Sequence, residues 1–257
     1  MSFSEEARTL LIEERADRLL VRLNRPEVRN AIDQQMVDEL HRVCAELERN
    51  PKILILTGAA GDGEKTGVFA SGADIAELRE RRREDALQGI NIKLFIRIAE
   101  LKMPVIAALE GYVLGGGAEL AFAADFRIGT PSIRIGNPET SLGIMAAAGA
   151  SWRLRELVGE PLAKEILLAG RVLNAEEALA AGLVSSLHDP AELLGAADAL
   201  ADRIAAQDPL AVQYTKAAFH SPRDAHPEVD LQAQAVLFES EEKFKRMTAF
   251  LEKRDRR

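Results

Sequence analysis

The sequence predicts an α/β protein, and three observations lead to that prediction. Its 257 residues suit one large α/β domain, or one domain with an appendage. Hydrophobic residues make up 47% of the chain and charged residues 29%, a balance that excludes disordered, collagen-like and disulfide-built chains. Apolar runs of strand length alternate with helix-like stretches up to about residue 190. We therefore treat residues 1–190 as an α/β core and residues 191–257 as a helical region.

The first elements follow from apolar spacing and from the residues that end each run. Residues 9–23 hold two apolar runs around a charged turn and predict a β-hairpin. Residues 31–49 have apolar side chains at helical spacing, and Pro51 ends that amphipathic helix. The continuous apolar run 53–57 predicts a strand covered on both faces.

The middle of the chain continues this alternation. Acidic residues surround the four arginines of segment 77–85, which favours a solvated helix face over a basic nucleic-acid segment. Residues 90–101 again have helical spacing. The apolar run 105–109 predicts a second buried strand, and the apolar, alanine-rich stretch 119–126 predicts a helix. Residues 133–135 predict a further short strand.

From Ser151 onward the pattern is helical. Asn174 is a good N-cap residue for a helix that Gly182 ends. The last helix is amphipathic and strongly charged. The other predicted helices lie at residues 151–158, 161–169, 191–206, 209–219 and 228–254.

Charge and composition limit the partners of the chain. Lys and Arg number 33 against 41 Asp and Glu, and a net charge of −8 disfavours non-specific nucleic-acid binding. Cys44 is the single cysteine, which fits a reducing compartment, and we interpret it as a small hydrophobe rather than a nucleophile. The N-terminus lacks a signal-peptide pattern and no apolar run is long enough to cross a membrane, so we expect a cytoplasmic protein.

Three consecutive glycines, Gly115 to Gly117, stand between a predicted strand and a predicted helix. Glycines let the backbone approach a ligand, and the first amides of a helix lack partners and lie at the positive end of its dipole. Such a junction can bind an anion or a developing oxyanion. It has neither the lysine of a phosphate loop nor the glycine spacing of a dinucleotide site. A purely structural junction is the alternative.

Two glutamates and a second loop accompany these glycines. Glu119 lies among apolar neighbours one turn into the helix, and Glu139 lies in a glycine-bounded turn. The two can form an acid/base pair; the alternatives are a helix N-terminal charge and a surface loop residue. At the end of segment 69–75, Ala73 precedes a helix and can offer a second free amide. The alternative there is a plain Asp-containing turn.

Three segments in this order, FASGADI, PVIAALEGYVLGGGAELAFAADFRI and GNPETSLG, resemble the enoyl-CoA hydratase/isomerase (crotonase) superfamily. The earlier LNRPEVRNAI and the later AGRVLNAEEALAAGLV are also similar to that family. The resemblance covers nearly the whole chain. It implies an α/β fold built as a spiral of ββα units, with a C-terminal α-helical region that forms homotrimers, often paired into homohexamers.

The resemblance also implies the chemistry. The substrate would be an acyl-CoA thioester, without a metal or other cofactor, in fatty acid metabolism of the β-oxidation type. The amides of Ala73 and Gly116 match the family's oxyanion hole, and Glu119 and Glu139 match the two glutamates of its hydratases. Isomerase relatives typically keep only the later glutamate, so the presence of both favours an enoyl-CoA hydratase. We assign the water to Glu119 and the α-proton to Glu139, a division that the sequence does not fix.

Binding residues follow from the same comparison and from charge. Coenzyme A is anionic and the protein is acidic, so local cations must compensate. Arg25 and Arg29 are candidates, with ordinary surface solvation as the alternative. Segments around the proposed oxyanion hole and near the C-terminus match family positions that meet the substrate or CoA: Ala70, Gly72, Asp74, Ile75, Gly115, Phe250 and Lys253.

The chain departs from many hydratases near the expected acyl pocket. Residues 144–150 replace a Pro-Gly-Ala-Gly-Gly run, and Asn137 stands where glutamine is common. These changes leave acyl-chain length open. Isomerisation, hydrolysis or decarboxylation of an acyl-CoA is the alternative reaction. A non-catalytic acyl-CoA-binding protein or an RNA-binding relative is the alternative class, and the acidic helix 31–49 disfavours the RNA binder.

Overall fold

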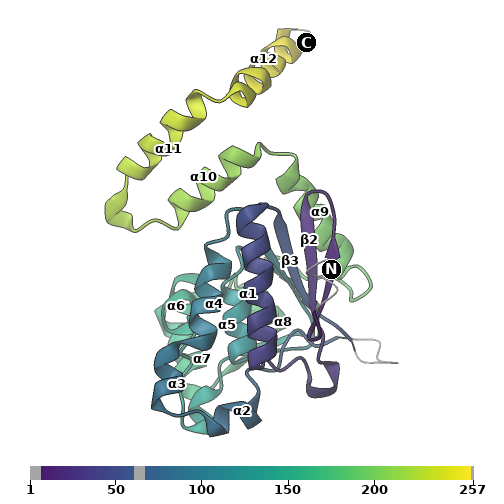
Figure 1. Ribbon diagram of the computed structural model, residues 1–257, viewed down its shortest axis with the longest axis vertical. Coiled ribbons are helices and arrows are strands. Elements are labelled where there is room, and N and C mark those ends of the chain that lie inside the picture. Colours follow the sequence, from purple (N-terminus) through teal and green to yellow (C-terminus); the bar gives the residue numbers. More distant parts are fainter. Residues whose placement is uncertain (1–6, 61–66, 256–257) are drawn as a thin grey trace. The chain divides into compact units, whose positions relative to one another are not determined.

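The computed structural model describes residues 7–60 and 67–255 and divides into two compact units, Met1–Ala201 and Asp202–Arg257. A five-stranded sheet in the order β1-β2-β3-β4-β6 runs through the first unit (Figure 1). β1 is antiparallel to β2, and the other neighbours are parallel. The strands span Leu10–Glu14, Arg18–Leu23, Ile53–Gly58, Val105–Leu109 and Phe126–Gly129. The predicted hairpin and both predicted buried strands are therefore confirmed.

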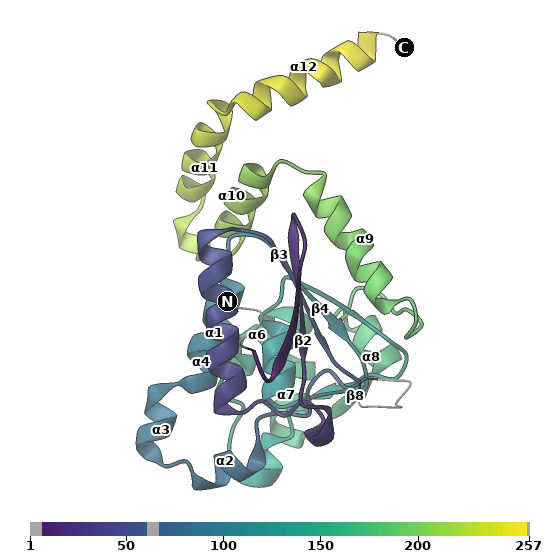
Figure 2. The same cartoon turned by 45° about the vertical axis from the view of Figure 1, so that its right-hand side comes forward.

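The two faces of this sheet belong to different parts of the core, which explains why the central strand β4 is apolar throughout. Alternate residues such as Val21 and Leu56 join the main core cluster. That cluster includes residues of α1 (Gln34–Arg49) and α4 (Ile90–Ala99). Intervening residues such as Leu20, Ile55 and Ile106 are also buried but lie outside the cluster, on the side of the first part of α9 (Leu193–Ala205). Figure 2 shows α1 and α4 on one side of the strands and α9 on the other.

Helix α1 starts later than its apolar pattern indicates. Asp33 caps it by accepting a hydrogen bond from the Met36 amide at 2.8 Å. Ile32, predicted as the first apolar helix residue, instead pairs with Ala73 in an isolated parallel bridge. This bridge brings the start of α1 to the predicted oxyanion segment.

A second sheet contains three strands of three residues each, in the order β5-β7-β8. They span Tyr112–Leu114, Arg134–Gly136 and Val172–Asn174. The strand predicted at 133–135 corresponds to β7, whereas β5 and β8 were not predicted. β6 was also missed, and the helix predicted over 119–126 ends at Phe122. Strands of three residues are too short to show an alternating apolar pattern, and they are defined by pairing with neighbouring strands.

The remaining helices of the first unit are short. The charged segment predicted as one helix face forms two helices that meet at Arg81 and Arg82. Asn174 caps α8 as predicted, accepting from the Glu177 amide at 2.9 Å. The helices are α2 (Ile75–Glu80), α3 (Arg83–Gln88), α5 (Gly116–Phe122), α6 (Ala150–Val158), α7 (Glu160–Ala169) and α8 (Ala175–Ala180).

The second unit is helical, with α10 (Pro209–Phe219), α11 (Glu228–Phe238) and α12 (Glu241–Asp255). The single helix predicted over 228–254 is wrong, because it is interrupted at Glu239 and Ser240. The Ser240 hydroxyl donates to the Leu237 carbonyl and accepts from the Lys243 amide, so it ends one helix and caps the next. Within the described ranges, no helix is long and apolar enough to cross a membrane.

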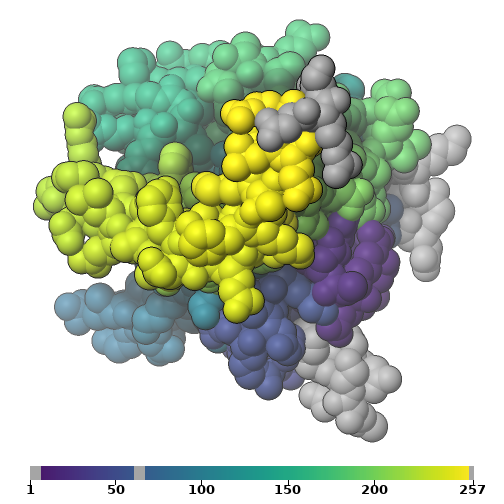
Figure 3. All heavy atoms as spheres, turned by 90° about the horizontal axis from the view of Figure 1, so that it is seen from above, coloured from purple at the N-terminus to yellow at the C-terminus, as the bar shows by residue number. Residues whose placement is uncertain are grey.

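Large apolar side chains are exposed along the second unit, whose surface is yellow-green and yellow in Figure 3. Leu231 is 62% exposed and Val236 is 46% exposed. The division at residue 201 lies in α9, after the boundary drawn from the sequence at residue 190. The assignment of residues 191–257 to oligomerisation stays a prediction.

Candidate active site

Backbone hydrogen bonds hold the segment around Ala73 between two neighbouring chain segments. On one side the Ile32 amide donates to the Gly72 carbonyl at 2.8 Å, and the Asp74 amide donates to the Ile32 carbonyl at 2.9 Å. On the other side Ala70 pairs with Val113 in a second parallel bridge. These bonds leave the Ala73 N–H without an acceptor among the residues that the structure describes.

The Asn30 side chain forms hydrogen bonds that hold the neighbouring segments of this region together. Its side chain is fully buried, donates to the Val68 carbonyl at 2.6 Å and the Ala59 carbonyl at 3.1 Å, and accepts from the Arg25 amide at 2.8 Å. Its φ of 54° lies in the left-handed region, which asparagine tolerates better than most residues. One side chain thus ties the 25–32 segment to both ends of the loop after β3.

The three glycines meet three different requirements. Gly115 has a φ of 52° and begins α5. A Cβ on Gly117 would lie only 2.5 Å from the Ala70 carbonyl oxygen, so only glycine lets α5 approach that segment. A Cβ on Gly116 would lie 3.4 Å from the Ala73 nitrogen. The Gly116 residue at the start of α5 therefore borders the space next to the unengaged Ala73 amide.

Glu119 lies inside the protein, one turn into α5. It is 3% exposed, and its Oε1 accepts from the amides of Ala148 at 2.6 Å and Ala150 at 3.1 Å. Burial raises the pKa of Glu119 to about 7; the two amides and the Arg153 charge oppose this shift, and the Glu139 charge adds to it. A carboxyl group with this pKa exchanges its proton near neutral pH.

Glu139 lies against the glycine junction and is not the surface residue that was the alternative. A Cβ on Gly115 would lie 3.2 Å from its Oε1, and the Asn137 amide donates to the same oxygen at 3.3 Å. Burial raises the pKa of Glu139, and hydrogen bonds only partly offset this shift. Its Oε2 is shielded from solvent without a partner among the described residues.

Shielded polar atoms that lack a protein partner gather around this junction. Buried polar groups are normally hydrogen-bonded, so each exception needs an explanation. Within the described ranges, five such side-chain atoms occur, and four belong to residues around the glutamates and the Ala73 segment. They are Oδ1 of Asn91, Oδ1 of Asn137, Oε2 of Glu139 and Nη1 of Arg153. This arrangement leaves hydrogen-bonding capacity for a ligand.

The predicted binding residues differ in how exposed they are and in whether their charges are already paired. Arg25 forms ion pairs with Asp33 at 3.2 Å and Asp74 at 3.1 Å, so its charge is already neutralised inside the protein. Arg29 is exposed and its guanidinium lies 5.5 Å from the centre of the Tyr112 ring. Ile75, which follows the α2 cap Asp74, is 57% exposed. Phe250 and Lys253 are exposed on α12 in the second unit, and their contact with CoA stays a prediction.

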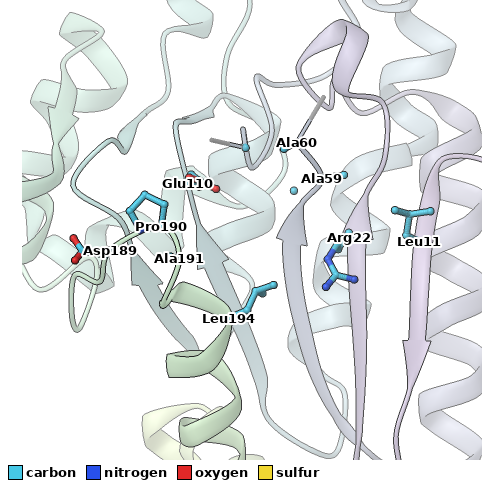
Figure 4. Close-up of a pocket in the computed structure, with 11 residues that line it drawn as sticks. Leu11, Arg22, Ala59, Ala60, Glu110, Asp189, Pro190, Ala191 and Leu194 are labelled. Atoms are coloured by element: carbon cyan, nitrogen blue, oxygen red, sulfur yellow. The ribbon is translucent and has the colours of Figure 1, made fainter. Parts of the chain in front are cut away.

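A separate pocket of about 680 Å³ lies elsewhere in the first unit (Figure 4). Arg22, Glu110, Asp189 and Leu194 are among its lining residues, and none of the predicted site residues lines it. Burial raises the pKa of Glu110, and a hydrogen bond from the Gly67 amide opposes this shift. Glu119, Glu139 and the Ala73 segment therefore lie outside this pocket.

The sequence matches the enoyl-CoA hydratase/isomerase family over residues 13–257. The chain belongs to this family. It is 36% identical to the short-chain-enoyl-CoA hydratase of Clostridium acetobutylicum, with 97% of each chain covered. It is 35% identical to the crotonyl-CoA hydratase of Syntrophomonas wolfei, with 95% of each chain covered.

A solved enoyl-CoA hydratase from Bacillus anthracis has the same fold. Its TM-score with this chain is 0.88 at 30% sequence identity, with 96% of this chain and 97% of that chain covered. The crotonase-like α/β fold is thereby confirmed. The sequence-based prediction of a hydratase agrees with the names of all three relatives.

Two residues around the site were not predicted. Asn91 carries a polar side chain in the first turn of the otherwise largely apolar helix α4, and that contrast was its only sequence signal. The charge of Arg153 acts on Glu119 from a distant position in the sequence, and no local pattern indicates this interaction.

No group of three or more His, Cys, Asp or Glu side chains within the described ranges is arranged to hold a metal.

The close approach at Gly117 predicts a strong effect of one methyl group. Gly117→Ala should lower the free energy of unfolding by about 1–3 kcal/mol, because its Cβ collides with Ala70. Gly195→Ala in α9 is the matched control, since nothing lies within 4 Å of that Cβ, and it should raise stability by about 0.5–1 kcal/mol. Urea unfolding compares the two; equal stability of both variants would show that the contact is unimportant.

The buried Glu119 predicts a pH-dependent stability difference between the wild type and Glu119→Gln. The pKa of Glu119 rises from 4.5 to about 7 on folding, so its neutral form favours the folded state. That contribution is fully present below pH 4.5 and is lost as pH rises through about 7. Relative to wild type, Glu119→Gln should gain up to about 3 kcal/mol over this range, measured by urea unfolding. A difference independent of pH would contradict the raised pKa.

Proposed function

We propose that this chain is an enoyl-CoA hydratase, which adds water across the double bond of a 2-enoyl-CoA thioester and gives the 3-hydroxyacyl-CoA. One observation supports this reaction above others. Two carboxyl groups, Glu119 and Glu139, lie beside a glycine junction that also borders the unengaged Ala73 amide. Hydration of a conjugated thioester requires an acid, a base and stabilisation of a negative oxygen, and this junction supplies groups for all three.

The backbone amides of Ala73 and Gly116 serve as the oxyanion hole. Attack of water on the β-carbon moves electrons through the conjugated system onto the thioester oxygen. Donors fixed in advance stabilise that charge without reorganising during the reaction. Gly116 also lies at the positive end of α5, which adds to the stabilisation.

The glutamates divide the proton transfers. Glu119, as carboxylate, accepts a proton from the attacking water, whose oxygen bonds to the β-carbon. Glu139, whose pKa burial raises, donates a proton to the α-carbon. Water is consumed, and return of the proton from Glu119 to Glu139 restores the starting state. The pKa of about 7 at Glu119 suits a group that must take and release a proton near neutral pH.

The remaining proposals concern binding and assembly. The CoA thioester is the substrate and no further cofactor is required; Arg29, Phe250 and Lys253 are the proposed contacts of the CoA part, together with the segment around Gly72. Arg25 holds Asp74 and supports that segment from inside. We further propose a cytoplasmic homotrimer or homohexamer in fatty acid β-oxidation, with no nucleic-acid or membrane partner.

Replacing either glutamate tests the mechanism. Glu119→Gln and Glu139→Gln preserve shape but remove the titrating group, and each should lower the hydration rate at least ~10²-fold. Loss of conjugation of crotonyl-CoA is the readout. Glu110→Gln changes another shielded glutamate, outside the site, and should retain the rate.

Different outcomes separate the possible reactions. Near wild-type hydration in both site variants would contradict the hydratase mechanism. Loss in Glu139→Gln alone would favour an isomerase that uses a single carboxylate. Tight acyl-CoA binding by a wild-type protein that turns over none of these substrates would identify a non-catalytic binder.

The exposed apolar residues of the second unit predict assembly. Burial of Leu231, Val236 and Leu237 in or beside a subunit interface should produce a closed trimer or hexamer. Light scattering should give that mass at micromolar concentration. Val236→Glu should weaken the assembly, whereas the exposed neighbour Glu239→Gln should not; a stable wild-type monomer would contradict the prediction.

A further inference from the structure

Asn91 places a side-chain amide at the junction between the Ala73 segment and α5. The position that a Cβ on Gly116 would occupy lies 3.5 Å from Nδ2 of Asn91 and 3.4 Å from the Ala73 nitrogen. Two nitrogen donors from different chain segments therefore border the same small space. Because residue 116 is glycine, that space contains no side-chain atom of its own.

The Asn91 carboxamide has no hydrogen-bond partner within the described ranges, although its Oδ1 is shielded from solvent. Its helix packs on the core through Leu94, Phe95 and Ile98, so that packing does not itself require a polar residue at position 91. A shielded polar group without a partner lowers stability. A hydrogen-bond acceptor on a ligand would give Nδ2 a partner, which explains a polar side chain at this position.

We propose that Asn91 Nδ2 donates a hydrogen bond to the thioester oxygen, as a third donor beside the amides of Ala73 and Gly116. The inference rests on the proposed function, because the acceptor is the oxygen of an acyl-CoA. A space already bordered by the Ala73 N–H favours an acceptor atom, which matches the nitrogen end of the carboxamide. Since negative charge grows on this oxygen during addition of water, the donor acts most strongly in the transition state.

Two variants of Asn91 separate donation from shape. Asn91→Leu keeps a similar size without a donor, and Asn91→Asp keeps the shape but presents only acceptors when ionised. With crotonyl-CoA, Asn91→Leu should lower kcat by at least ~10-fold with little change in KM, and Asn91→Asp should lower it further. Lys93→Leu is the matched control, because it places the same side chain at an exposed position of α4 and should leave kcat unchanged.

A second readout measures charge stabilisation without turnover. Acetoacetyl-CoA ionises to an enolate that absorbs in the near ultraviolet, and an oxyanion hole favours that enolate. The pH at which bound acetoacetyl-CoA ionises should be higher in Asn91→Leu than in the wild type and in Lys93→Leu. If Asn91 had only a structural role, this pH could not shift in a variant whose thermal stability is unchanged.

The outcomes distinguish this inference from the proposed function. Unchanged kcat and unchanged enolate formation in a folded Asn91→Leu protein would overturn the role of Asn91. A defect confined to KM, or to enoyl-CoAs with a hydroxyl group on the acyl chain, would also overturn it and assign Asn91 to acyl selection. If the wild type hydrates no enoyl-CoA but Asn91→Leu still disfavours the bound enolate, the hydratase proposal fails and the donor role stands.

Discussion

The site depends on the hydrogen bonds that place the segment from Ala70 to Asp74 between two other parts of the chain. Ile32 lies on one side of this segment and Val113 on the other. Each bridge uses backbone donors and acceptors of the segment, yet the Ala73 N–H has no acceptor among the described residues. Gly117, in the first turn of α5, allows this helix to come close enough for Gly116 to border the same space. A regular sheet would have used the Ala73 amide in its own ladder, so isolated bridges are what leave it available.

The same region holds one buried and one half-buried carboxyl group, Glu119 and Glu139, and each is supported differently. Glu119 accepts two backbone amides from the segment that leads into α6, which partly offsets the burial that raises its pKa. Glu139 has one side-chain donor, Asn137, and keeps an oxygen without a partner. One oxygen of the more buried group thus accepts both backbone amides, and the less buried group retains capacity to hydrogen-bond a ligand. This asymmetry is consistent with separate roles in one reaction.

The parts of the fold that could be predicted are the elements whose own residues show the apolar spacing of a helix or a strand. The apolar runs of β3 and β4 and the helical spacing of α1 identify their elements, because burial imposes that pattern directly. The three-residue strands β5 and β8 could not be predicted, since pairing with β7 defines them. Ser240 interrupts the last predicted helix through side-chain bonds that composition does not indicate.

The candidate site shows the same limit. The family motifs identify Glu119, Glu139, Ala73 and Gly116, but sequence spacing does not reveal which of their atoms are free. Arg25 looks like a surface cation in the sequence, and only the fold brings Asp33 and Asp74 to it. Conversely, Asn91 lies 25 residues before Gly116 in the chain, and only the packing of α4 brings it to that glycine.

The most direct test of this account is turnover in Ala73→Pro, because proline removes the N–H that the hydrogen-bonded bridges leave free. The account predicts a folded protein, by circular dichroism, that still binds acyl-CoA but hydrates crotonyl-CoA about 10²–10³-fold more slowly. Ala73→Gly keeps the N–H and should retain most of the activity. A folded Ala73→Pro protein that hydrates crotonyl-CoA at the wild-type rate would contradict the central claim that this backbone amide stabilises the oxyanion.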